Sequence, residues 1–312
     1  MAVLTSCGDP TDGSADGPPP GEPPPASLVG LAVMGASNSD EYRTDDDRGG
    51  SYGATTLNWV EQLVASRRLN FGAPGTWGEP RRSGYAYNWA RSGATAASLV
   101  AMGQHTGVAE QVRRGQVSHA FLYVGSNDFH PTNGSYEEIY DGSLSGAGLQ
   151  AKIDRVAGSM ATALDEVRGA GPVGIMTVNV GDPGLDPSAF RAFPSAAGRA
   201  RVTAAIRATN DRIQEMADSR RVPVIDLNGF AVRLLDRVNE QGFLIVGGEP
   251  IDVARRGSEP HHLRLDDSSG HPGTVMSGLM ANGLFLDALN RHYGTGVPLL
   301  TDEEILRNAG IR

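Results

Sequence analysis

The chain has 312 residues and a formal net charge of −9, because 36 acidic side chains outnumber 27 basic ones. An acidic chain without a basic run is a poor candidate for binding nucleic acid, since neutralisation of phosphates dominates that affinity. Its one cysteine, Cys7, excludes an internal disulfide and a multi-cysteine zinc site, and the chain has no run of about 20 apolar residues that could span a membrane.

The first 27 residues are expected to form a tail. Residues 8–27 carry seven prolines and four acidic residues but no large apolar side chain, so they cannot bury enough surface to offset the entropy of ordering. Before them, Leu4-Thr5-Ser6-Cys7 resembles a bacterial lipobox, although only three residues precede Leu4. Two interpretations stay open: Cys7 carries a lipid that anchors an extracytoplasmic protein to a membrane, or it is a free cysteine in the tail of a cytoplasmic protein.

Five apolar runs bounded by turn residues predict buried strands. They cover residues 28–34, 85–90, 119–124, 173–180 and 222–227. Segments with the spacing of helices lie between and after them, at 57–64, 153–167, 196–219 and 274–290. This alternation indicates an α/β fold, a three-layer α/β/α sandwich around a mainly parallel five-stranded sheet.

The carboxyl end of the chain is expected to add one short helix over residues 302–309. A capping box from Thr301 to Glu304 marks its start, and Gly310 marks its end. We therefore divide the chain into a tail over 1–27, one domain over 28–295, and an extension over 296–312.

In a parallel sheet, ligands bind at the carboxyl ends of the strands, so catalytic residues are expected in the loops there. Ser37 follows the first expected strand, Gly93 the second, and Asn127, in a Gly-Ser-Asn-Asp sequence, the third. Asp267 and His271 lie just before the helix that begins near residue 274. Each of these residues alone is equally typical of a turn or a helix cap.

Together, in this order, the four segments resemble the SGNH (GDSL-type) hydrolase family over about residues 28–295. The resemblance implies a flavodoxin-like SGNH fold that needs neither cofactor nor metal. It also implies that Ser37 is the nucleophile and that His271 is the base and then the acid. The N–H groups of Ser37 and Gly93 and the side chain of Asn127 would form the oxyanion hole.

The chain departs from the family pattern at two positions. Ala36 replaces the usual aspartate before the nucleophile, which is not a member of the triad. Ser268 stands three residues before His271, where the family has its acid. We predict that Asp267, one residue further back, orients His271, with Asp266 as the alternative.

Other polar residues near these segments are further candidates for the site. His130 and Asp128 follow Asn127 and are expected at the rim of the pocket, as is Asp266, and His130 is a weaker candidate for the base. The pair His261-His262 fits a solvated loop better than a metal site, since adjacent histidines point in different directions. The run Asp45-Asp46-Asp47 is expected to be a solvated loop or to repel anionic substrates.

These observations predict a serine hydrolase that cleaves carboxylic esters through an acyl-enzyme. A small-molecule or polysaccharide ester is the expected substrate, and a carbohydrate deacetylase is one candidate within that class. A catalytically weak binding module and an acyltransferase of the same fold remain as alternatives. The sequence leaves the oligomeric state and the acyl length open.

Overall fold

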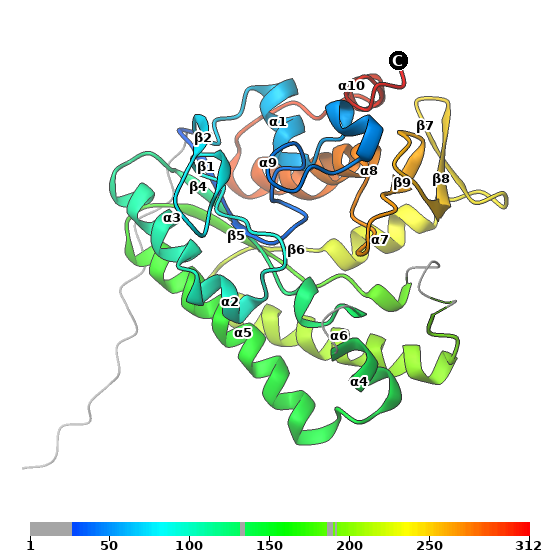
Figure 1. Cartoon of the computed structure of the whole chain (residues 1–312). Helices are drawn as coiled ribbons and strands as arrows, with labels where there is room; N and C mark the ends of the chain where they lie inside the picture. The colour runs from blue at the N-terminus through cyan, green and yellow to red at the C-terminus, as the bar shows by residue number, and fades with distance from the viewer. Residues whose placement is uncertain (1–26, 132–134, 186–189, 191) are drawn as a thin grey trace, which may run out of the picture.

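Four apolar segments pair in parallel at the centre of the molecule (Figure 1). In a computed structural model, which describes residues 27–131, 135–185, 190 and 192–312, they form a sheet in the order β1-β4-β5-β6. The tail and Cys7 lie outside the described residues. The strand bounds are Leu31–Gly35 for β1, His119–Tyr123 for β4, Gly174–Val178 for β5 and Val224–Ile225 for β6.

Helices cover both faces of this sheet, as the alternation of strands and helices predicted (Figure 1). Neighbouring residues of a strand point to opposite faces, so Leu31 and Val33 pack into one apolar core while Ala32 and Met34 pack into the other. One core takes α1, α7, α8, α9 and α10, and the other takes α2 to α6. The fold is therefore a three-layer α/β/α arrangement.

Within the described ranges, helices occur at all five expected segments, and four further α-helices were not expected from the sequence. On the first face they are α1 (Trp59–Arg67), α7 (Leu227–Leu235), α8 (Thr274–Met280), a π-helical segment (Ala281–Leu286), α9 (Asp287–Tyr293) and α10 (Asp302–Asn308). On the second they are α2 (Ala96–Ala101), α3 (Gln104–Arg113), α4 (Ser135–Asp141), α5 (Gly146–Gly169) and α6 (Ala196–Asp218). Short 3₁₀ turns occur at Gly50–Thr55, Ser126–Asp128 and Pro183–Leu185.

The prediction of a full strand over 85–90 was wrong. This segment runs beside β1 with a single parallel bridge, from Val33 to Asn88. Asn88 turns its own N–H back to the carbonyl of Tyr85 (3.0 Å), and its side-chain amide donates to the carbonyl of Ser39 (2.6 Å). The backbone therefore follows the edge of the sheet without forming a regular ladder, and the sheet has four strands instead of five.

Two small sheets were not expected from the sequence. β2 (Pro74–Thr76) and β3 (Ser83–Tyr85) form an antiparallel pair. β7 (Phe243–Val246), β8 (Glu249–Arg256) and β9 (His262–Arg264) form a three-stranded sheet at the edge of the molecule (Figure 1). An isolated antiparallel bridge joins Arg264, at the end of β9, to Pro272. This small sheet therefore holds the loop that carries His271.

The carboxyl-terminal extension packs into the first core. The capping box predicted for α10 is present, with Thr301 accepting from the backbone of Glu304 and the Glu304 side chain accepting from Thr301 N–H. Ile305 and Leu306 are fully buried against the helices of that core. Among the described helices, none is long and apolar enough to cross a bilayer.

Candidate active site

One cavity of about 190 Å³ opens at the carboxyl ends of the parallel strands. Ser37 from the loop after β1, Asn127 from the turn after β4, and His271 from the loop before α8 all line it. Their contributing segments lie far apart in the sequence, so the fold brings them together where the topology predicted a ligand site.

A tight turn at the end of β1 presents Ser37 to this cavity. The N–H groups of Ser39 and Asp40 both donate to the carbonyl of Ala36, at 2.9 and 3.1 Å. Gly35 is the last residue of β1. Its N–H donates to the side chain of Gln104, and its carbonyl accepts from the same side chain. On the other side Gly35 is paired with β4. A Cβ on Gly35 would stand 2.7 Å from a backbone oxygen of β4, so glycine is required there. Ser37 itself is half-buried.

His271 is bonded to Asp267. The Nδ1 atom lies 2.7 Å from Asp267 Oδ2, and the second carboxylate oxygen accepts from the backbone N–H groups of Ser269 and His271, each at 3.2 Å. Burial opposes the charge on Asp267, but the bonds from His271 and the nearby Arg48 outweigh it and hold the pKa of this carboxyl well below its usual range. The imidazole therefore faces a carboxylate that is ionised at neutral pH.

The neighbouring Asp266 has a different role. Its carboxylate accepts a 2.6 Å hydrogen bond from Ser258, and it does not line the cavity, where the sequence had placed it at the rim. Asp267 is thus the aspartate that contacts His271. The turn between them lets this happen: Gly270 has a φ of +63°, and its N–H donates to the carbonyl of Asp267.

Of the residues expected to form the oxyanion hole, Ser37 and Asn127 line the cavity and Gly93 does not. Asn127 lines the cavity, and its Nδ2 donates to the carbonyl of Ala94 at 2.9 Å. This bond uses one of the two amide hydrogens and ties Asn127 to the segment that follows Gly93. Gly93 has a φ of +82°, which favours glycine, and it is not among the residues that line the cavity.

His130 and Asp128 separate in the structure. His130 lines the cavity together with His271, and burial lowers its pKa. Asp128 does not reach the cavity, against the expectation that it lies at the rim. Instead its carboxylate accepts from the N–H of Ala96 at 2.9 Å, at the start of α2, and burial raises its pKa.

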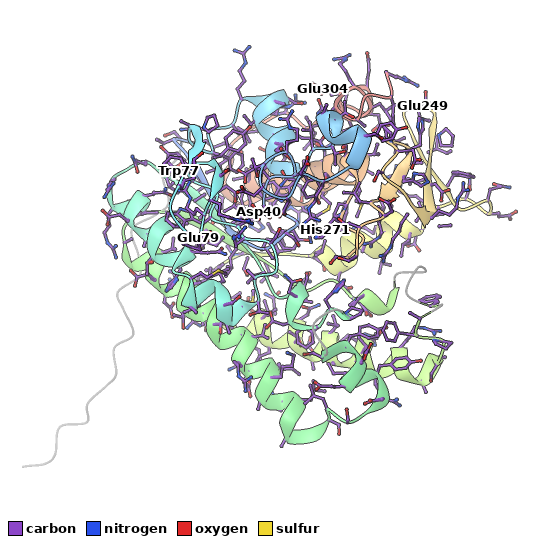
Figure 2. All side chains as sticks on the ribbon, viewed as in Figure 1. Asp40, Trp77, Glu79, Glu249, His271 and Glu304 are labelled. Carbon is purple, nitrogen blue, oxygen red and sulfur yellow. The ribbon has the colours of Figure 1, made fainter. Side chains whose placement is uncertain are left out.

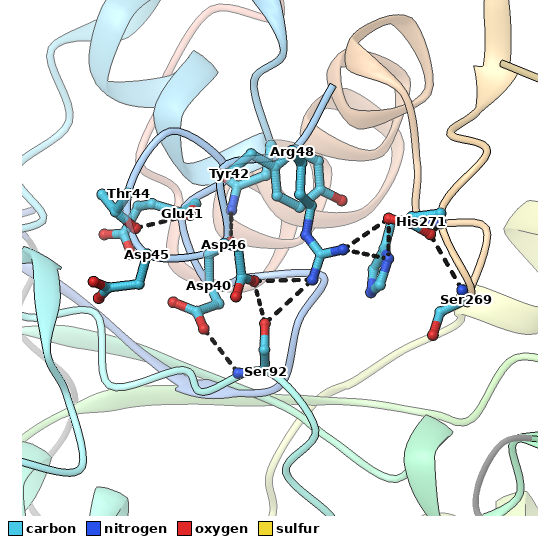
Figure 3. Close-up of polar contacts among 12 residues, drawn as sticks. Asp40, Glu41, Tyr42, Thr44, Asp45, Asp46, Arg48, Ser92, Ser269 and His271 are labelled. Atoms are coloured by element: carbon cyan, nitrogen blue, oxygen red, sulfur yellow. Dashed lines mark hydrogen bonds and ion pairs between the residues drawn. The ribbon is translucent and has the colours of Figure 1, made fainter. Parts of the chain in front are cut away.

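The acidic run Asp45-Asp46-Asp47 is not simply a solvated loop. Asp45 accepts from the N–H of Ser83 at 2.8 Å, and Asp46 pairs with Arg48 at 2.9 Å. Arg48 in turn reaches Asp267 (Figure 3). Arg48 was not expected at this site, because no local sequence pattern distinguishes it from any other charged residue in the segment.

In the part of the chain that the structure describes, no group of three or more His, Cys, Asp and Glu side chains is arranged to hold a metal ion. His262, from the adjacent histidine pair, lies 3.2 Å from Glu259 instead.

No protein-family model matches the chain, and no curated protein matches it significantly. Solved structures are similar to it at low identity. A variant of an acetyl xylan esterase from Geobacillus stearothermophilus has 15% identity and a TM-score of 0.45, over 88% of this chain and 97% of that one. The acetyl xylan esterase AlAXEase has 11% identity and a TM-score of 0.44, over 80% and 95%. An alpha/beta hydrolase from the metagenome of Lake Arreo, Spain, has 16% identity and a TM-score of 0.41, over 91% and 96%. At these values the likeness carries no conclusion about activity.

Proposed function

We propose that the chain is a serine hydrolase of carboxylic esters, of the SGNH type that its sequence resembles. One observation carries this proposal: the Asp267–His271 pair, bonded at 2.7 Å, faces the same cavity as Ser37 and Asn127. An acid, an imidazole, a hydroxyl and an amide donor are the groups that acyl transfer to serine needs.

In this mechanism Ser37 Oγ attacks the carbonyl carbon of the ester while His271 Nε2 takes the hydroxyl proton. Asp267 stabilises the imidazolium through Nδ1. The negative oxygen of the tetrahedral intermediate accepts hydrogen bonds from Ser37 N–H and the Asn127 amide, with Gly93 N–H as the third proposed donor. The imidazolium then gives its proton to the leaving alcohol. Water, activated by the same histidine, releases the acid and restores Ser37.

The substrate class follows from the size of the site. A cavity of about 190 Å³ is below the roughly 300–1,000 Å³ of pockets that enclose drug-sized ligands. We therefore propose short acyl esters, with acetylated carbohydrates among them. An extracytoplasmic location with a lipid on Cys7 stays a prediction of the sequence.

The first experiment replaces Ser37 with alanine and measures hydrolysis of 4-nitrophenyl acetate and labelling by a fluorophosphonate. Loss of a nucleophile with its base still in place typically costs about 10⁶-fold in kcat, so Ser37→Ala is expected to lose both turnover and label. Ser126 and Ser269 also line the cavity, and their alanine variants are expected to keep the label.

Three outcomes would count against the proposal. Hydrolysis that persists in purified Ser37→Ala protein would show that another group attacks the ester. A wild-type protein with neither turnover nor label would favour a binding module, and acyl transfer to a sugar or alcohol that outcompetes water would favour an acyltransferase.

A further inference from the structure

Arg48 lies beside His271 and is bonded to Asp46 and Ser92 (Figure 3). Nη1 of Arg48 lies 2.7 Å from Asp267 Oδ2 and 2.8 Å from His271 Nδ1. Nη2 donates to Asp46 Oδ2 at 2.9 Å and to Ser92 Oγ at 3.3 Å. One guanidinium therefore connects the loop after β1, the segment that leads into the expected oxyanion hole, and the loop that carries the base.

The loop that carries Arg48 is fixed from several sides. The N–H of Arg48 donates to the carbonyl of Tyr42 at 2.9 Å, and the N–H of Tyr42 donates to the buried carboxylate of Glu61 in α1 at 3.1 Å. Glu41 accepts from the N–H of Tyr85 at 2.8 Å. The side chain of Arg48 is only 13% exposed, so its position is set by the fold and not by solvent.

The ring of Tyr42 contacts the side chains of both Arg48 and His271. The guanidinium carbon of Arg48 lies 5.4 Å from the ring centroid, within the range of a cation–π contact. The imidazole of His271 meets this ring edge-on, with 6.3 Å between the ring centroids. Because Tyr42 is fully buried, it limits the movement of both side chains.

Two tautomers of His271 fit these contacts, and they differ in whether Arg48 Nη1 donates to Asp267 or to the ring. A guanidinium only donates, and both Arg48 Nη1 and His271 Nδ1 lie 2.7 Å from the same oxygen of Asp267. When Nδ1 carries the proton, both nitrogens donate to this oxygen and Nε2 is left to accept a proton. If Nδ1 accepted from Arg48 instead, the proton would lie on Nε2 and the imidazole would not be a base toward a serine.

The charges of these side chains add a second effect. Asp46 and Asp267 contribute two negative charges and Arg48 one positive charge. Arg48 therefore offsets one of the two carboxylates that it bonds, and the charge of the other faces His271.

We infer that Arg48 is a positioning residue: it holds Asp267 in place, and through Asp267 it keeps the proton of His271 on Nδ1, while its second nitrogen ties this pair to Ser92 beside the expected oxyanion hole. This inference rests on the proposed ester hydrolysis. Arg48 does not line the cavity, so its effect acts through His271 and not through contact with a substrate.

The test compares Arg48→Gln and Arg48→Lys with wild type, using the neutral ester 4-nitrophenyl acetate. Loss of an outer partner that orients a functional histidine typically costs about 10- to 100-fold, so Arg48→Gln is expected to lower kcat by that factor and to leave KM unchanged. Arg48→Lys keeps the charge but has one nitrogen, which reaches Asp267 or Asp46 but not both. Its kcat is expected to lie between those of wild type and Arg48→Gln.

The spectroscopic readout is the ¹⁵N and ¹H NMR signal of the His271 ring. Wild type is expected to show the Nδ1–H tautomer with a strongly deshielded proton, and Arg48→Gln is expected to show a mixture of tautomers and loss of this proton by exchange. The matched control is Arg67→Gln. Arg67 is 12% exposed and pairs with Glu304 at 2.8 Å between α1 and α10, so its loss is expected to lower stability without changing kcat or the signal.

Retention of kcat and of the Nδ1–H signal in folded Arg48→Gln would overturn the inference. A fall in kcat with an intact Nδ1–H signal would also overturn the inference if kcat recovers when the assay is cooled below the melting transition of the variant. Such a recovery would show that the variant is only less stable. The NMR measurement needs no turnover. If wild type has no esterase activity, the proposed function fails, while the tautomer comparison still decides whether Arg48 positions His271.

Discussion

Two aspartates next to each other in the chain have different surroundings. Asp267 is bonded to His271 and Arg48, whereas Asp266 is bonded to Ser258 and lies outside the cavity. The sequence ranked them in this order but kept both open, because the length of the turn before His271 could not decide which one faces the ring. The contact depends on the left-handed backbone of Gly270.

Asp267→Asn is expected to lower kcat for 4-nitrophenyl acetate by about 10²- to 10⁴-fold, because an amide does not hold the Nδ1–H tautomer or stabilise the imidazolium as a carboxylate does. Asp266→Asn is the matched control and is expected to keep wild-type kcat. Steady-state kinetics at neutral pH measures both. Equal losses in the two variants would contradict the assignment of the orienting acid.

The residues of the candidate site differ in how far the sequence could identify them. Ser37, Asn127 and His271 follow or precede expected elements, and the order of their segments carries the family resemblance from which their roles were expected. Arg48 contacts Asp267 across 219 positions and His271 across 223. Such contacts depend on how loops pack in three dimensions, and a single sequence has no periodic signal for them.

At the level of elements, the strands buried on both faces were the most predictable. β1, β4 and β5 are each buried throughout, so they read as continuous apolar runs. β8 mixes apolar and charged residues and lies at the edge of the molecule, which explains why it was missed. The segment over 85–90 has the composition of a strand, but its bonds to β1 make only one isolated bridge, and the N–H of Asn88 turns back to Tyr85.

The link between α1 and α10 gives a pH-dependent stability. Hydrogen bonds from Arg67 and from Thr301 lower the pKa of Glu304 from 4.5 to about 2. Between these values the unfolded chain binds a proton that the folded protein does not, so this stabilisation is complete above about pH 4.5 and is lost as the pH falls toward 2. Figure 2 labels Glu304 on α10 and His271 at the site.

Glu304→Gln is expected to lower Tm by about 1–3 °C at pH 7, since partly exposed ion pairs contribute up to about 1 kcal/mol. The difference is expected to close near pH 2. Glutamine can preserve the capping box, so the change removes the charge and one of the hydrogen bonds from Arg67. Glu303→Gln, whose pair with Arg307 is exposed, is the control with a smaller shift. Thermal unfolding at several pH values measures this, and a Tm difference that does not depend on pH would contradict it.

At the scale of the whole molecule, the layers place apolar side chains along the cavity that Ser37 lines. Leu227 from α7 and Met276 and Met280 from α8 line the same cavity as Ser37. The three-layer order was predictable from alternating elements, but the depth of the cavity was not. Depth depends on the crossing of α7 and α8 over the sheet, which no sequence pattern specifies.

These apolar side chains are expected to limit the acyl chain. We expect kcat/KM to be highest for two- to four-carbon esters and at least about 100-fold lower for the sixteen-carbon ester, because a site of this size cannot bury the long chain. Met276→Ala is expected to move the optimum to longer chains. A series of 4-nitrophenyl esters measures this. A preference for long chains in wild type would contradict the proposed substrate class.

The packing of α10 has a practical consequence for anyone who shortens this protein. Gln62 of α1 bonds the carbonyl of Thr274, three residues after His271, and accepts in turn from Asn308 of α10. Ile305 fills the space beside Gly278 in α8. A fragment cut after residue 295 would lack the support beneath the helix that follows His271, so a shortened protein should still reach Ile311, whose side chain packs against the core.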